Sequence, residues 1–95
     1  MTRTKISDGN IVFVGGKKIM DYVTGVVAQF NNNVSEVIIR SRGKFISKAV
    51  DVSEVVRKKA LKDVSTKEIK LDSQEFDNKE GKRVTVSTID IVLKK

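Results

Sequence analysis

Six basic side chains in the first half of this sequence have the type and placement that phosphate binding needs. They gather near glycines at expected turnings of the chain, and they are Lys17, Lys18, Arg40, Arg42, Lys44 and Lys48. Glycine lets a backbone approach a phosphate closely, and helix N-termini offer N–H groups to anions. Lysine and arginine neutralise phosphates and release their counterions, which drives binding to a polyanion. The alternative is a basic face that is merely solvated.

The composition favours a polyanionic partner and argues against catalysis. Nineteen Lys and Arg residues against twelve Asp and Glu give a net charge of +7, which favours association with a polyanion. The chain has no Cys and no His, which excludes Ser/His/Asp and Cys/His catalysis and a zinc finger. We therefore expect no enzyme, no cofactor and no metal site. A small-anion-binding enzyme subunit is the alternative that nucleotide binding would favour.

Apolar periodicity places the basic residues at the ends of regular elements. Residues 10–14 predict a short buried strand, and residues 34–40 a second strand. A helix is predicted to begin at Ile19 and to end at a run of three asparagines. A turn at residues 41–44 precedes a second helix over residues 45–61. Because the turns after two parallel neighbouring strands lie at the same end of a sheet, both basic clusters should share one surface.

The second helix carries more apolar surface than one sheet covers. Its expected buried stripe consists of Ile46, Ala49, Val50, Ser53, Val56 and Ala60. Val52 and Val55 widen this stripe, which indicates a contact with a second subunit; a fully packed helix in a monomer is the alternative. Among the aromatic residues, we expect Phe13 and Phe30 in the core and Phe45 on the surface beside the basic turn.

The last third of the chain predicts a hairpin, with strands over residues 66–76 and 83–93 around a turn at residues 77–82. The apolar alternation changes parity along each strand, which indicates a bulge near Ser87 and Thr88. Because only the base of the hairpin is strongly apolar, we expect the tip to project as an arm. A mobile loop with ordinary charges is the alternative to an arm that follows a duplex into its minor groove. The tip carries Lys79, Lys82 and Arg83 against Asp77 and Glu80, and Lys82 and Arg83 are its candidate contacts to a nucleic acid.

Together these elements predict an α+β fold of two layers, in the order β-α-β-α-β-β. The sheet is mixed and four-stranded, and its last two strands form the protruding arm. One domain spans residues 10–95 and follows a flexible N-terminus at residues 1–9. No apolar run approaches the ~18 residues of a membrane span, and no signal-peptide core is present. We therefore expect no membrane partner and a cytoplasmic location.

Several motifs resemble the Alba family of small archaeal chromatin and RNA-binding proteins over about residues 10–95. These motifs are Ile11-Val12-Phe13-Val14-Gly15 with Lys17, Met20-Asp21-Tyr22-Val23, Glu36-Val37-Ile38-Ile39-Arg40-Ser41-Arg42-Gly43-Lys44, Ile46-Ser47-Lys48-Ala49-Val50-Asp51 and Val86-Ser87-Thr88-Ile89. Their order along one short chain is hard to obtain by chance. The resemblance implies a homodimer whose fold is akin to the C-terminal domain of translation initiation factor three.

The resemblance also implies a function and partners. Family dimers bind double-stranded DNA without marked sequence preference, with the dimer body over the backbone and the arms in the flanking minor grooves. They thereby coat and compact archaeal chromatin at the chromosome or nucleoid. Because family members also bind RNA, an RNA-binding ribonucleoprotein subunit or RNA-stabilising protein is the alternative. Further implied partners are another Alba-like chain in a heterodimer and a lysine acetylase or deacetylase.

Family residues carry over to this chain one by one. Lys17 matches a family lysine and is the implied acetylation site, whereas Gly16 and Lys18 depart from the family's Gly-Lys-Lys-Pro loop. Ala60 stands where some members place a phenylalanine that joins neighbouring dimers, so we expect weaker filament formation here. The basic turn and the start of the second helix match at Arg42, Lys44 and Lys48, and the arm matches only in kind at Lys82 and Arg83.

Overall fold

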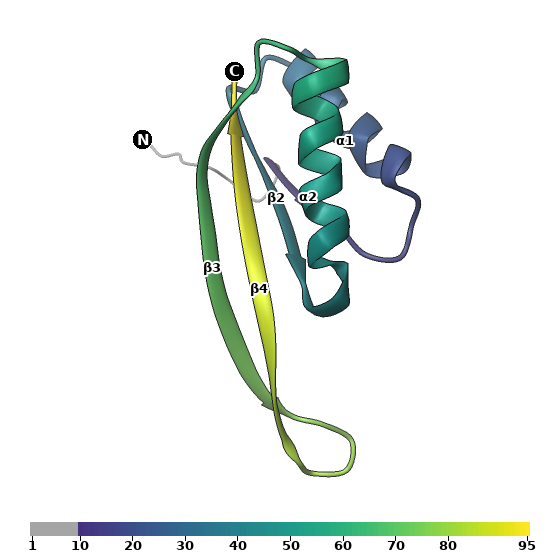
Figure 1. Cartoon of the computed structure of the whole chain (residues 1–95), viewed down its shortest axis with the longest axis vertical. Coiled ribbons are helices and arrows are strands. Elements are labelled where there is room, and N and C mark those ends of the chain that lie inside the picture. Colours follow the sequence, from purple (N-terminus) through teal and green to yellow (C-terminus); the bar gives the residue numbers. More distant parts are fainter. Residues whose placement is uncertain (1–9) are drawn as a thin grey trace.

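A computed structural model describes residues 10–95, in which two helices cover one face of a sheet (Figure 1). The elements are β1 (Ile11–Phe13), α1 (Ile19–Asn31), β2 (Glu36–Arg42), a 3-10 turn (Gly43–Phe45), α2 (Ile46–Val55), a π-helical turn (Val56–Ala60), β3 (Ser65–Asp77) and β4 (Arg83–Lys94). The strand order is β1-β2-β4-β3, with β1 parallel to β2 and the other pairs antiparallel. The predicted two-layer α+β fold is confirmed, while the expected flexible segment, residues 1–9, lies outside the described residues.

The core lies between the two helices and the sheet face that they cover. Its largest fully buried side chains are Phe30, Ile39, Ile91, Leu93, Val26, Val37, Val52 and Val56. Each such side chain stabilises the fold by ~1.5–3 kcal/mol on burial. The expected burial of Phe30 is confirmed, and α1 ends in the asparagine run, where Asn33 has a left-handed φ of 67°.

The boundary of β2 differs from the prediction. The strand runs to Arg42, so residues 34–40 were placed about two residues too early and residues 41–44 do not form a single turn. The reason is that Ser41 is buried inside the sheet, where its hydroxyl donates a hydrogen bond to the carbonyl of Val14 (2.9 Å). A serine whose hydroxyl is satisfied in this way is compatible with a strand interior.

The buried stripe of α2 also differs from the prediction. Val50 and Ala60 are exposed, and Val52 is fully buried. The helix packs over β2 and β4 through Ala49, Val52 and Val56, which share one face at i, i+3 and i+7. Val52 therefore belongs to the core, and Val50 is the residue that extends the apolar surface outward.

Phe13 is 65% exposed, contrary to its expected place in the core. In the register of β1 with β2, Phe13 is the partner of Arg40 and so points to the sheet face that the helices leave open. The prediction that residues 10–14 form a buried strand is also wrong for β1. This strand lies at the edge of the sheet, and its residues are half-buried or exposed.

The expected bulge near Ser87 and Thr88 is wrong. The pairing of β3 with β4 is regular there, and its one irregularity lies between Thr66 and Glu68 at the base of the hairpin. The change of parity along β4 means that its apolar residues move from one face of the sheet to the other. Near the body, alternate residues of β4 face the helices and are buried, whereas Val84 and Val86 in the arm belong to the open face.

Beyond the end of β2, the hairpin of β3 and β4 continues away from the body as an arm (Figure 1). β3 is exposed along its whole length. At the tip, the Asn78 side-chain oxygen accepts hydrogen bonds from the N–H groups of Glu80 (2.9 Å) and Lys82 (3.0 Å). Gly81 takes a φ of 79°, which favours glycine. The chain therefore has a built turn at the expected residues.

Candidate nucleic-acid interface

The loop between β1 and α1 is held by two side chains from other parts of the fold. The Tyr22 hydroxyl on α1 accepts hydrogen bonds from the backbone N–H groups of Gly15 (2.9 Å) and Lys17 (3.0 Å). Lys48 on α2 donates to the carbonyl oxygens of Gly15 (2.9 Å) and Lys17 (2.8 Å). The loop backbone is thus fixed on both sides, while the side chains of Lys17 and Lys18 are exposed.

The same contacts lower the pKa of Tyr22 below its ordinary value of 10.0. The largest cause is the hydrogen bond from the Lys17 N–H, and burial opposes it. The Gly15 N–H and the positive charges of Lys48 and Lys17 lower the pKa further. Donors and nearby cations stabilise the phenolate relative to the neutral phenol. The titration of Tyr22 therefore reports on the state of this loop.

A second basic element lies where β2 ends. Gly43 has a φ of 59°, which favours glycine, and a Cβ there would lie 3.6 Å from the Val86 side chain. This sharp turn separates Arg42, the last residue of β2, from Lys44, and both side chains are exposed. The Lys44 ammonium lies 5.4 Å from the centre of the Phe45 ring, within the range of a cation–π contact.

Lys48 joins the two basic elements, because it lies in the first turn of α2 and its ammonium binds the loop before α1. The structure therefore brings Lys17 and Lys18 to the same end of the molecule as Arg42 and Lys44. The ammonium of Lys48 itself is occupied by two carbonyl oxygens. Lys48 at the rim of the phosphate-binding cluster stays a prediction, and the contact that the structure shows for its ammonium holds the loop.

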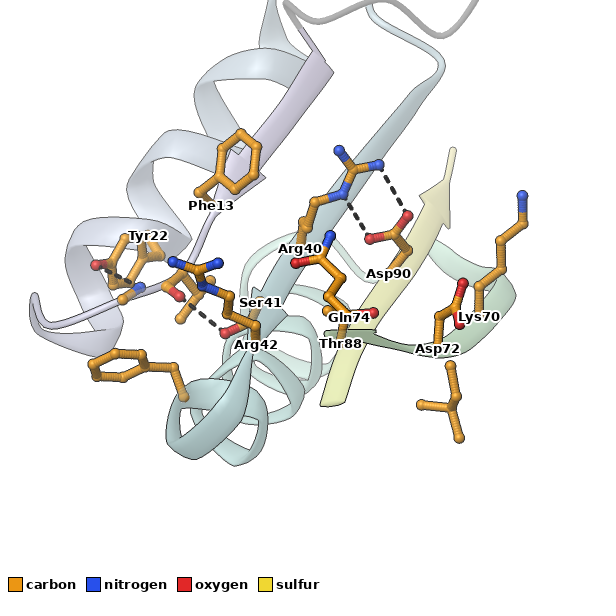
Figure 2. A pocket seen from close by; sticks show the side chains of 14 residues that line it. Phe13, Tyr22, Arg40, Ser41, Arg42, Lys70, Asp72, Gln74, Thr88 and Asp90 are labelled. Atoms are coloured by element: carbon orange, nitrogen blue, oxygen red, sulfur yellow. Dashed lines mark hydrogen bonds and ion pairs between the residues drawn. The ribbon is translucent and has the colours of Figure 1, made fainter. Parts of the chain in front are cut away.

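Arg40 is engaged in a forked ion pair across the sheet. Its Nε lies 2.7 Å and its Nη2 2.9 Å from the two carboxylate oxygens of Asp90 on β4 (Figure 2). The guanidinium also lies 5.7 Å from the centre of the Phe13 ring. A bidentate pair fixes the guanidinium plane more firmly than a single hydrogen bond does. Arg40 therefore lies beside the basic cluster with its charge compensated.

The cations at the arm tip lie away from these loops. Lys82 is exposed, and Arg83 pairs with Glu75 (3.0 Å) and with Asp77 (3.2 Å). All three members of this cluster are largely exposed, so solvent screens their interaction. The arm thus carries its two predicted site residues, but one of them is neutralised by the hairpin itself.

The sequence analysis did not predict that the Tyr22 hydroxyl binds the loop or that Asp90 pairs with Arg40. It also did not predict that Phe13 is exposed. The helical period gave no indication that the Tyr22 hydroxyl would cap backbone N–H groups. Asp90 did have a signal: it alternates with the buried Ile89 and Ile91, so it must face the opposite side of the sheet. A charged residue at such a position needs a partner, and Arg40 lies across from it.

Within residues 10–95, no group of three or more His, Cys, Asp or Glu residues lies close enough together to hold a metal ion. Over the same part of the chain, no helix is long and apolar enough to cross a membrane.

The comparisons with known proteins agree on one family. The family model that matches, Alba, covers residues 10–73. The DNA/RNA-binding protein Alba 1 of Archaeoglobus fulgidus is 49% identical over 86 residues, or 90% of this chain and 96% of the relative. The DNA/RNA-binding protein Alba of Methanococcus maripaludis is 49% identical over 85 residues, or 88% and 96%.

Two solved structures share the fold. Alba from Thermoplasma volcanium has a TM-score of 0.85 at 49% identity and covers 90% of this chain and 100% of that one. The crystal structure of ALBA1 from Trypanosoma brucei has a TM-score of 0.73 at 27% identity, over 94% of this chain and 71% of that one.

Proposed function

The chain belongs to the Alba family, and from this premise we propose that it is a sequence-nonspecific DNA-binding protein that coats and compacts archaeal chromatin as a homodimer. Relatives that share about half of its residues carry the name DNA/RNA-binding protein, which supports nucleic-acid binding by this chain. The same name supports RNA as a second ligand, and a ribonucleoprotein role is the alternative function.

One observation carries the proposal: two exposed basic pairs share one end of the molecule. Lys17 and Lys18 extend from a loop fixed by hydrogen bonds, and Arg42 and Lys44 flank a glycine turn next to it. Exposed cations on a backbone that is held in place can bind the phosphates of a duplex, and such contacts read no base. Arg40, Lys48, Lys82 and Arg83 already have partners or lie apart, so we assign them supporting contacts.

Binding is tested by fluorescence anisotropy with two unrelated DNA duplexes, a single-stranded RNA and a hairpin RNA over a range of salt. Four phosphate contacts predict a slope of log affinity on log salt of about −3.6 per protomer on duplex DNA. Arg42→Ala should weaken both duplexes equally. Lys62→Ala, an exposed cation beyond the opposite end of α2, is the matched control and should change neither.

Other results would redirect the proposal. A preference for one duplex over the other would contradict nonspecific binding. A clear preference for the hairpin RNA that persists as salt rises would favour the ribonucleoprotein function.

The homodimer is supported by an apolar surface on the outermost strand. Ile69 and Leu71 are 56% and 75% exposed, and their register partners on β4 are buried against the helices. Because α2 packs over β2 and β4, the helix side of β3 is open to a second copy. Val50 on α2, which is 40% exposed, adds to the apolar surface on this side of the sheet. The same surface would accept another Alba-like chain.

Sedimentation equilibrium tests this dimer. Leu71→Glu should give monomers at concentrations where the unmodified protein is a dimer, because it places a charge in an apolar contact. Gln74→Glu adds the same charge on the opposite face of β3 and should leave the dimer intact. A monomeric unmodified protein, or a dimeric Leu71→Glu variant, would contradict the interface.

Two finer points follow from exposure. Lys17 is exposed and reachable by an acetylase, and loss of its charge would remove one phosphate contact. Ala60 is exposed in the turn that ends α2 but offers only a methyl group. We therefore propose that dimers of this chain bind side by side on DNA with little cooperativity.

A further inference from the structure

The sheet face opposite the helices carries an aromatic ring that the fold does not bury. Phe13 is 65% exposed on β1. The strand registers place it in a row across the sheet, followed by Arg40 on β2, Asp90 on β4 and Lys70 on β3. Folding gains little from a phenylalanine in this position, since most of its apolar surface is in contact with water. The ring is therefore available to a ligand.

The surroundings of this ring are hollow and are lined by both polar and apolar groups (Figure 2). The hollow measures about 1010 Å³. It offers hydrogen-bond donors and acceptors together with two further aromatic rings, Tyr22 and Phe45. The charged side chains that line it are Arg40, Arg42, Lys70, Asp72 and Asp90, and Gln74 and Thr88 add uncharged polar groups. A flat aromatic face next to such mixed polar groups is what a nucleobase requires.

The ring is also held in place. The Arg40 guanidinium lies 5.7 Å from the centre of the Phe13 ring, and its fork is fixed by Asp90. The Phe45 ring also lines the hollow, and the ammonium groups of Lys44 and Lys48 lie 5.4 Å and 5.5 Å from its centre. Aromatic rings accompanied by cations bind both the bases and the backbone of an open strand.

We propose that this face binds an unpaired nucleobase of single-stranded nucleic acid, stacked on Phe13. Arg42, which lines the hollow, and Lys44, whose ammonium lies beside the Phe45 ring of the hollow, bind the phosphates that flank the base. The bases of a duplex are stacked inside the helix and cannot reach the ring, so this site acts on open strands only. The inference rests on the proposed nucleic-acid function and adds to it a second mode of binding.

The charges around the hollow favour a nucleic acid over an apolar peptide. The nearby loop cations Lys17 and Lys18 extend the positive edge beyond Arg42 and Lys44. A polyanionic strand that crosses this edge gains from counterion release. Every base has an aromatic face, so stacking tolerates any sequence and either sugar.

The test compares single strands with a duplex and varies only the ring. Phe13→Leu keeps an apolar side chain on β1 but removes the aromatic face, and Phe13→Tyr keeps that face. Anisotropy is measured with single-stranded RNA, single-stranded DNA and duplex DNA at one salt concentration. We expect Phe13→Leu to weaken both single strands about tenfold and the duplex by less than about twofold. Phe13→Tyr should stay within about twofold of the unmodified protein on every ligand.

A second readout separates stacking from a structural effect. A strand that contains 2-aminopurine should lose fluorescence on binding to the unmodified protein and to Phe13→Tyr, because stacking quenches this base. Phe13→Leu should not quench it at saturating protein. Equal losses on single strands and duplex, or unchanged quenching in Phe13→Leu, would overturn the inference.

The outcomes distinguish this site from the proposed function. If duplex DNA binds normally and single strands do not bind, the inference fails and the proposed function stands. If no nucleic acid binds, the proposed function fails and the site falls with it.

Discussion

The loop before α1 and the hairpin arm both present cations, but the fold holds them in different ways. The loop is tied down by Tyr22 and Lys48, which come from two helices. The arm is held by its own strand pairing and turn. Residues 75–83 contain three acidic and three basic side chains, so the arm is locally neutral. Within residues 10–95, none of the ion pairs involves Lys17, Lys18, Arg42 or Lys44. The body therefore presents exposed charge on a fixed backbone, whereas the arm extends beyond the body with little net charge.

This contrast predicts where affinity resides. The double variant Lys17→Ala/Arg42→Ala should weaken duplex binding roughly 10- to 100-fold, because two charge-assisted contacts are lost. The slope on log salt should become shallower by about 1.8. The arm variant Lys82→Ala/Arg83→Ala should change that slope by about 0.9, since Arg83 is already paired with Glu75.

Anisotropy titrations over a range of salt measure both variants. Equal losses in the body and arm variants would break the contrast and assign the arm the same electrostatic role as the body.

The next prediction concerns the free energy of unfolding. Lys48→Met should lower it by about 1–2 kcal/mol, because two hydrogen bonds from a charged donor are lost at a partly exposed site. Tyr22→Phe should lower it as well, because the Gly15 and Lys17 N–H groups lose their acceptor. Each kcal/mol shifts Tm by about 4–8 °C in a domain of this size. Thermal unfolding at one protein concentration measures both variants.

The matched control for this comparison is Lys82→Met in the arm. Its side chain has no ion-pair contact to lose among those seen at the tip, so Tm should change by less than about 2 °C. A Lys48→Met variant as stable as Lys82→Met would show that the loop is not fixed by the ammonium.

The charge of the arm offers a smaller and opposite effect. Glu75→Gln/Asp77→Asn removes both partners of Arg83 and leaves its guanidinium to a phosphate. Duplex affinity should rise by roughly 2- to 5-fold, and the salt slope should become steeper by about 0.9. Titration against duplex DNA measures this gain. Weaker or unchanged binding would mean that the arm does not approach the backbone.

Much of this fold was predictable because periodicity records burial. The helical spacing that ends in Phe30 and the alternation of Ile89, Ile91 and Leu93 both mark residues that face one core. Phe13 was misplaced because a three-residue edge strand is too short for alternation to show which face its residues take. The prediction of a bulge was wrong because the apolar residues of β4 lie on the helix face near the body and on the open face in the arm, while the strand pairing stays regular.

The candidate site was predictable in position but not in chemistry. The rule for parallel strands correctly placed the two basic turns together, and the structure shows the link through Lys48. The ion-pair partner of a charged side chain can lie far away in the sequence. Arg40 pairs with Asp90, fifty residues later, and a local sequence pattern does not predict such a pair. Composition counts cations, and only the fold shows which of them are compensated.

The smallest predicted effect is a shift in the pKa of Tyr22, whose hydroxyl holds the loop before α1. Tyr22 is the only tyrosine and the chain has no Trp, so ultraviolet absorption follows its ionisation alone. Its midpoint should lie below 10.0, because the N–H groups and the nearby cations favour the phenolate. Since the folded pKa is lowered, this group adds stability above pH 10.0 that is lost as pH falls through the folded pKa.

Two changes should move this midpoint upward. Lys48→Met removes one of the positive charges that lower the pKa of Tyr22, and bound DNA brings phosphates next to the Lys17 loop, where they oppose the phenolate. Lys82→Met should leave the midpoint where it is, because the arm tip is remote from Tyr22. A midpoint at or above 10.0 in the free protein would mean that the loop N–H groups do not bind the hydroxyl in solution. An unchanged midpoint on DNA would place the phosphates away from this loop and toward the arm.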